Sequence, residues 1–274
     1  MALVSGFDDH EGIGAAWVFV RRHGVWSEQQ KLTAPRTGPD REIGQAGFGL
    51  SVALAGNGRI ALLSAPADMG YPDSGPGAAW VFTRGHRGWT STQKLAAPPS
   101  GAGAEIGDAS FGADVALATD GDAALIGGPS DNGDAGAAWE FIRRDGGWSY
   151  ANKLSVLRAG SDGEIGEAAF GMSVALSAEG DLALVGGPYD DGNLGAVWEF
   201  RSQPAPLGGA AWSEGEKLTA PSTGAAQEEG DALFGEAVAL DADGDTAFVG
   251  GPNAPAGLIH GTPGRGAAWV FAAP

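Results

Sequence analysis

One unit recurs along this chain, and the repetition constrains its fold more than any other feature. A stretch that starts with Phe-Gly and ends with Gly-Pro or Ala-Pro begins at Phe48, Phe111, Phe170 and Phe234. All nine tryptophans follow the same period: five end a Gly-Ala-Ala-Trp motif or its variant, and four open a motif that ends in Lys-Leu. Repeats of this kind fold as supersecondary units that bury their apolar faces only by stacking on their neighbours.

Each repeat of roughly 60 residues contains four short strand candidates. Typical examples are Ser-Val-Ala-Leu-Ser at 173–177, Leu-Ala-Leu-Val-Gly at 182–186, Gly-Ala-Ala-Trp-Val-Phe at 14–19 and Trp-Ser-Glu-Gln-Gln-Lys-Leu at 26–32. In the third strand, alternation places Trp17 and Phe19 on one face and Val18 on the other. Proline and glycine cluster between the strands, and no apolar period of 3.6 residues is sustained, so the pattern predicts an all-β chain.

Four antiparallel strands per unit, apolar on both faces, predict a single β-propeller over 1–274 with about five four-stranded blades. The alanine-rich first strand suits the crowded centre, and the strand ending in Lys-Leu suits the outside. The motifs add up to 18 strands, because the first unit lacks an inner strand and the last lacks an outer one. The terminal blades are therefore expected to be incomplete, in a five-bladed ring or in a piece of a longer propeller. The expected repeat units are 1–47, 48–110, 111–169, 170–233 and 234–274.

Taken together, the Phe-Gly, Ser-Val-Ala-Leu, Asp-Gly-Asp, Gly-Gly-Pro and Gly-Ala-Ala-Trp-Val-Phe elements resemble the FG-GAP repeat. This repeat is known from the propeller of integrin α subunits and from bacterial proteins. The resemblance implies a β-propeller that acts in binding or adhesion outside the cell or at its surface. The first residues, Met-Ala-Leu-Val-Ser-Gly, show no signal peptide pattern.

Composition excludes several classes of function. The formal net charge is −18, which disfavours nucleic acid and anionic membrane surfaces, because both need a basic patch. No apolar run is long enough for a membrane span, so no membrane insertion is expected. The chain has no cysteine, so disulfides and thiolate metal sites are excluded. The histidines lie at unlike repeat positions and no nucleophile or metalloprotease motif occurs, so we expect no enzyme.

Acidic residues are expected to gather on one rim of the predicted disc, where the loops between the second and third strands meet the loops between units. The arginines of the loops between the third and fourth strands fall on the opposite rim. The acidic rim predicts cation binding or recognition of a basic partner, and the alternative is turn chemistry and solubility. The recurring acids of this rim are Asp9, Asp68, Asp131 and Asp190 after the second strand, and Glu42, Glu105, Glu164 and Glu228 before Phe-Gly.

Calcium is the candidate cofactor, because it takes six to eight oxygen ligands and paired loops supply several. The FG-GAP resemblance implies a calcium loop between the first and second strands of a unit. The richest turn there is Asp-Ala-Asp-Gly-Asp-Thr-Ala, with Asp241, Asp243 and Asp245. It is shorter than a full calcium loop, and Asp-Gly is also a favoured hairpin turn. The candidate metal ligands are therefore these three aspartates and the recurring glutamates.

Two tyrosines, Tyr71 and Tyr189, fall in loops of the acidic rim and are candidate stacking platforms for a glycan. The function expected overall is a non-enzymatic binding or adhesion module that recognises a protein partner, with calcium dependence as a testable addition. The alternative is a glycan-binding, lectin-like propeller or a structural part of a larger secreted protein. The incomplete terminal blades add self-association as a further expectation.

Overall fold

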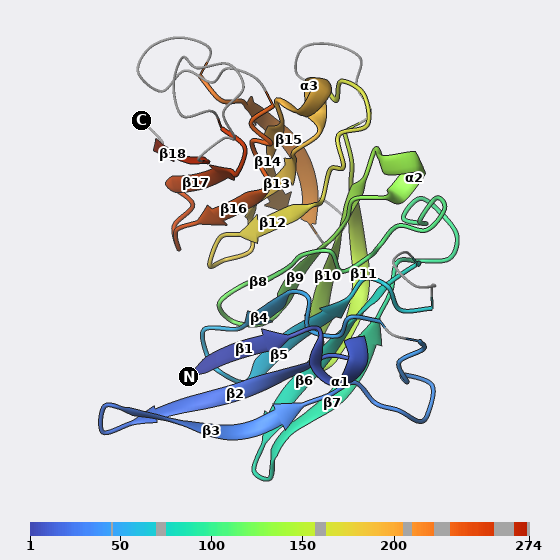
Figure 1. The fold of residues 1–274 in the computed structure, drawn as a ribbon, viewed down its shortest axis with the longest axis vertical. Coiled ribbons are helices and arrows are strands. Elements are labelled where there is room, and N and C mark those ends of the chain that lie inside the picture. Colours follow the sequence, from blue (N-terminus) through green and yellow to red (C-terminus); the bar gives the residue numbers. More distant parts are fainter. Residues whose placement is uncertain are drawn as a thin grey trace.

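The computed structural model describes residues 1–44, 46–69, 75–156, 163–204, 210–221, 231–254 and 266–272. In this part of the chain, 18 strands form five antiparallel sheets arranged as the blades of a β-propeller, which confirms the predicted fold (Figure 1). The three middle sheets have four strands each, and the first and last have three. The incomplete terminal blades expected from the motif count are therefore present.

Within every blade the strands follow one another in chain order, and the inner strands of successive blades contact one another. The first blade comprises β1 (Ala2–Gly6), β2 (Ala15–Arg22) and β3 (Val25–Leu32). The three middle blades comprise β4 (Val52–Leu54), β5 (Ile60–Ala65), β6 (Ala78–Gly85) and β7 (Gly88–Leu95); β8 (Val115–Leu117), β9 (Ala123–Gly128), β10 (Ala137–Arg144) and β11 (Gly147–Leu154); and β12 (Ser173–Leu176), β13 (Leu182–Gly187), β14 (Ala196–Pro204) and β15 (Ala210–Leu218). The last blade comprises β16 (Ala237–Leu240), β17 (Thr246–Gly251) and β18 (Ala267–Ala272).

The two faces of each blade pack against different neighbours. In the fourth blade, Val185 and Trp198 form a cross-strand pair on the face that packs against Leu125 of the third blade. The opposite face carries Leu184 and Val197, which pack against the fifth blade. The middle blades have a neighbouring blade on each side. The apolar residues on both of their faces are therefore buried, as the alternation in the sequence predicted.

A Phe-Gly turn joins each blade to the one before it. Phe111 is fully buried, and its ring centroid lies 5.4 Å from that of Trp139. Its backbone forms a parallel bridge with Gly77 of the preceding unit. Gly77 has a φ of +80°, and a Cβ there would lie 2.2 Å from the Phe111 carbonyl oxygen. Only glycine fits this position, and the corresponding Gly14, Gly136 and Gly195 form the same bridge.

The outward faces of the first and last blades remain uncovered. Val4 of β1 is 51% exposed, whereas Val185, its counterpart in the fourth blade, is fully buried. On the last blade, Phe248 and Val270 are 49% and 61% exposed. The first and fifth blades therefore do not bury these faces against each other.

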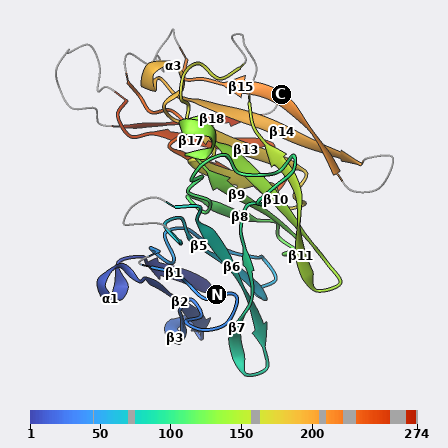
Figure 2. The ribbon, with the colours of Figure 1, turned by 90° about the vertical axis from the view of Figure 1, so that its right-hand side faces the viewer.

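Three single turns, α1 (Asp9–Gly12), α2 (Asp131–Asp134) and α3 (Asp190–Asn193), directly precede β2, β10 and β14 of their blades. Residues inside them have left-handed backbones, such as Asn132 and Gly133 in α2, which suits Asn, Asp and Gly. In Figure 2, α1 and α3 lie toward one side of the molecule, and the β10–β11 hairpin turn lies toward the other. No helix among the described residues is long and apolar enough to cross a membrane.

Candidate functional site

Three of the four recurring aspartates of the predicted acidic rim, Asp68, Asp131 and Asp190, are buried. Asp131 is 2% exposed, and its Oδ1 accepts the backbone N–H of Ile106 at 2.6 Å. Its Oδ2 lies 2.7 Å from Nζ of Lys153, the lysine of the Lys-Leu motif on β11. The same ammonium lies 5.0 Å from the ring centroid of Trp139. Asp131 thus holds the loop between units against the outer strand, which is a structural role.

Two further blades repeat this arrangement with Asp68 and Lys94, and with Asp190 and Lys217, both pairs being largely buried. Their carboxylates also accept the backbone N–H groups of Ile43 and Ile165. In the first blade, Asp9 pairs with Lys31, but these side chains are 30% and 41% exposed. All four lysines lie over a tryptophan ring. These contacts confirm that the two kinds of loop share one rim.

The glutamates before the Phe-Gly turns are half-buried beside the aspartates. Burial, and then the charge of Asp68, raises the pKa of Glu42 to about 7. Burial likewise raises the pKa of Glu105 and of Glu164, with Asp131 and Asp190 as further causes. One carboxylate oxygen of Glu42 and one of Glu105 are buried without a hydrogen-bond partner among the described residues. These glutamates are therefore poorly placed to carry full negative charge.

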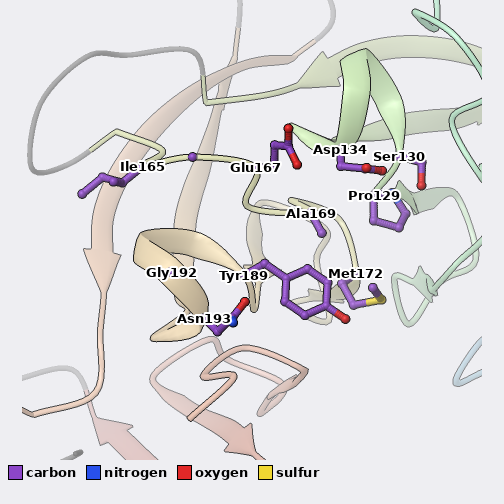
Figure 3. Close-up of a pocket in the computed structure, with 11 residues that line it drawn as sticks. Pro129, Ser130, Asp134, Ile165, Glu167, Ala169, Met172, Tyr189, Gly192 and Asn193 are labelled. Carbon is purple, nitrogen blue, oxygen red and sulfur yellow. The ribbon is translucent and has the colours of Figure 1, made fainter. Parts of the chain in front are cut away.

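A pocket of about 530 Å³ opens on the same rim between the third and fourth blades (Figure 3). It contains the ring of Tyr189, which is 41% exposed and reaches toward Met172. Asp134 and Ser130 enter from α2 and the residue before it, Asn193 enters from α3, and Glu167 comes from the loop before Phe170. An aromatic face is thus combined with two exposed carboxylates, an amide and a hydroxyl.

This pocket departs from the repeat, which separates it from the recurring turn chemistry. Tyr189 stands directly before the aspartate of its unit, where the other units have Asp8, Ala67, Ser130 and Asn253. Met172 likewise stands where the others have Leu50, Ala113 and Glu236. The sequence indicated Tyr189 as a candidate platform. It did not indicate Asp134 and Asn193, because their position beside Tyr189 depends on the left-handed turns of α2 and α3.

The remaining candidates lie apart from this pocket. Asp241, Asp243 and Asp245 are exposed in the β16–β17 turn, and Asp241 accepts the backbone N–H of Thr246 at 3.1 Å. That hydrogen bond lowers the pKa of Asp241. Within the described ranges, no group of three or more His, Asp or Glu side chains gathers closely enough to hold a metal ion. Tyr71 and Glu228 lie outside the described residues.

Comparison with known proteins adds only distant likenesses. No family model and no curated protein matches the chain. Among solved structures, similar chains include a protein assigned as TolB from Agrobacterium tumefaciens, with a TM-score of 0.42 and 10% identity over 83% of this chain and 58% of that one. A protein from Lactobacillus plantarum gives a TM-score of 0.42 and 12% identity over 95% of this chain and 66% of its own. A protein from Bacteroides fragilis assigned as a 6-phosphogluconolactonase gives a TM-score of 0.34 and 10% identity, over 86% of this chain and 69% of its own.

Proposed function

We propose that this chain is a non-enzymatic binding module of the FG-GAP type, which holds a basic side chain of a protein partner in the Tyr189 pocket. The observation that carries the proposal is the exposed Tyr189 ring in a pocket that also contains Asp134 and Glu167. A guanidinium or ammonium group over an aromatic face gains a cation–π contact, and carboxylates beside it add charge-assisted hydrogen bonds. The net charge of −18 favours the approach of a basic partner.

Glycan recognition is the second candidate, and the same residues support it. Tyr189 offers a ring for stacking against a sugar, while Asn193 and Ser130 supply neutral hydrogen-bonding groups. The two candidates differ in their dependence on salt. Binding of a basic side chain weakens as ionic strength rises, whereas stacking and neutral hydrogen bonds respond little.

Parallel screening of the protein on a peptide array and on a glycan array tests this proposal. We expect hits among Arg- and Lys-containing peptides, with binding at least about tenfold weaker in Tyr189→Ala and Glu167→Gln, which corresponds to about 1.4 kcal/mol. Glu179→Gln makes the same charge change at an exposed turn outside the pocket and is the matched control. Hits confined to glycans, again lost in Tyr189→Ala, would replace the protein-binding proposal with the lectin-like one. If binding of the hits is unchanged in both pocket variants, the pocket is not the binding site for a peptide or for a glycan.

Calcium dependence and an extracellular location stay predictions from the sequence. A thermal melt with chelator and then with millimolar calcium tests the first, because a ligand that binds only the folded state raises the melting temperature. An increase with calcium and not with magnesium would add the cation to the proposed function. An unchanged melting temperature would leave the acids of the rim to the structural roles described above.

A further inference from the structure

The uncovered face of the first blade has the same composition as faces that are covered elsewhere in the molecule. On this face, β1 and β2 form the cross-strand pairs Ala2–Phe19, Val4–Trp17 and Gly6–Ala15. The fourth blade has Ala–Phe, Val–Trp and Gly–Ala pairs at the corresponding places, and so does the fifth. The six residue types are therefore identical in the three blades. The difference is that this face is buried in the fourth and fifth blades and exposed in the first.

In the fourth and fifth blades this face packs against the preceding blade and against the phenylalanine of a Phe-Gly turn, and the inner strand that follows the turn pairs with the edge of the sheet. Phe170 lies 5.5 Å from Trp198 and 5.8 Å from Phe200 between ring centroids. The next residues form β12, in which Val174 pairs with Val185. Phe234 makes the same two ring contacts with Trp269 and Phe271. Val185 and Val249 are fully buried by these contacts together with those of the preceding blade, such as Leu125 beside Val185.

None of the described residues occupies that position on the first blade. β1 is the edge strand of its sheet, so one side of its backbone has no neighbouring strand. Val4 is 51% exposed, and Trp26 of the outer strand is 49% exposed, whereas Trp89 in the next blade is 3% exposed. An open strand edge beside a large apolar face is the arrangement to which extended segments add as an extra strand.

We propose that the first blade binds an extended segment that carries Phe-Gly followed by a β-strand of the Ser-Val-Ala-Leu type. The phenylalanine packs on Trp17 and Phe19, and the strand pairs with the free edge of β1 so that its valine faces Val4. The partner is thus defined by its chemistry: an aromatic residue, a glycine that permits the tight turn, and alternating apolar residues of small size. This surface lies apart from the Tyr189 pocket, and its occupation does not depend on the function proposed for that pocket.

A synthetic peptide of residues 166–177, Gly-Glu-Ala-Ala-Phe-Gly-Met-Ser-Val-Ala-Leu-Ser, is the probe, because it covers the same face in the fourth blade. Calorimetric titration into the intact chain should give saturable binding at one site. We expect binding at least about tenfold weaker when the phenylalanine of the peptide is replaced by alanine, because the ring contacts are then lost.

Two variants of the protein locate the binding site. Val4→Glu places a charge on the proposed surface at a position that is already half exposed, and should abolish peptide binding. Phe248→Glu makes a comparable change on the exposed face of the last blade and should leave peptide binding unchanged. Folding of both variants is checked by their melting temperatures.

Three results would overturn the proposal. The first is absence of binding by the wild-type peptide, and the second is equal binding by the peptide that lacks phenylalanine. The third is a protein that is a stable oligomer by sedimentation and that becomes monomeric in both Val4→Glu and Phe248→Glu, since a second copy would then cover these faces. A monomer that binds the peptide only through Val4 supports the proposal.

Discussion

Nζ of Lys153 lies 2.7 Å from Oδ2 of Asp131, and both side chains are almost fully buried. Removal of one partner from such a pair leaves an uncompensated charge, which costs about 3–5 kcal/mol. Lys153→Met should therefore lower the free energy of unfolding by that amount in denaturant titrations. Lys31→Met removes the same type of pair where it is 30–41% exposed, and should cost about 1 kcal/mol or less. Equal losses in the two variants would contradict the structural role assigned to the buried pairs.

Trp139 is buried in the core, whereas Trp26 lies on an exposed surface. Trp139 is fully buried against Phe111, and its indole N–H donates to the Gly103 carbonyl at 2.8 Å. Trp139→Ala should cost about 3–5 kcal/mol because it leaves a large cavity. Trp26 is 49% exposed, so Trp26→Ala should cost much less. Urea titrations of both variants measure the difference, and a costly Trp26→Ala would mean that this ring is covered in solution.

The glycine at the bridge between blades is expected to be intolerant of substitution. At Gly77, alanine would combine a positive φ with a Cβ overlapping the Phe111 carbonyl. We expect Gly77→Ala to destabilise the protein by about 2–4 kcal/mol, since the backbone of the turn must move. At Gly38, φ is +90° but nothing lies within 4 Å, so Gly38→Ala should cost only about 1 kcal/mol. Similar costs at the two sites would show that φ alone decides the effect.

Glu42 should make stability depend on pH. Its pKa is about 7 in the folded protein and near 4.5 otherwise, so the folded state binds the proton more tightly. The favourable contribution is present below about pH 4.5 and is lost as the pH rises through 7. Glu42→Gln should therefore raise stability at pH 8 by about 1–2 kcal/mol, after allowance for the partial exposure of the side chain, and should have little effect at pH 4. Melting curves at both pH values check this, with Glu179→Gln as the exposed control. A gain of the same size at pH 4 would exclude the proton as its cause.

The strands could be predicted because short-range rules determine them: alternation places Trp17 and Phe19 on one face, and glycine and proline mark each turn. The sharing of one rim by two kinds of loop also followed, because it depends only on up-and-down order. The β-bulge in the pairing of β2 with β3, between Val18 and Phe19, could not be predicted, since it depends on the twist of two strands together.

For the acidic rim, the sequence indicated the residues but not their environment. Asp131 appears in a turn-like stretch, and turn acids are usually exposed. Its burial depends on Lys153, which is distant in sequence and reaches it only once the outer strand is formed. A signal was nevertheless present, because the aspartate and the lysine occur together in all four units that contain an outer strand.

In the fifth unit, Ala254 takes the place of the aspartate and is 3% exposed within the apolar cluster of that blade. An alanine there leaves no buried carboxylate that needs a lysine partner. The two arrangements are separated by intermediates that carry one unpaired buried charge. A single substitution that removes one partner of the pair therefore lowers stability before the second substitution restores it. The aspartate and the lysine of a unit are therefore expected to change together. A designer who recombines these repeats must exchange both residues at once.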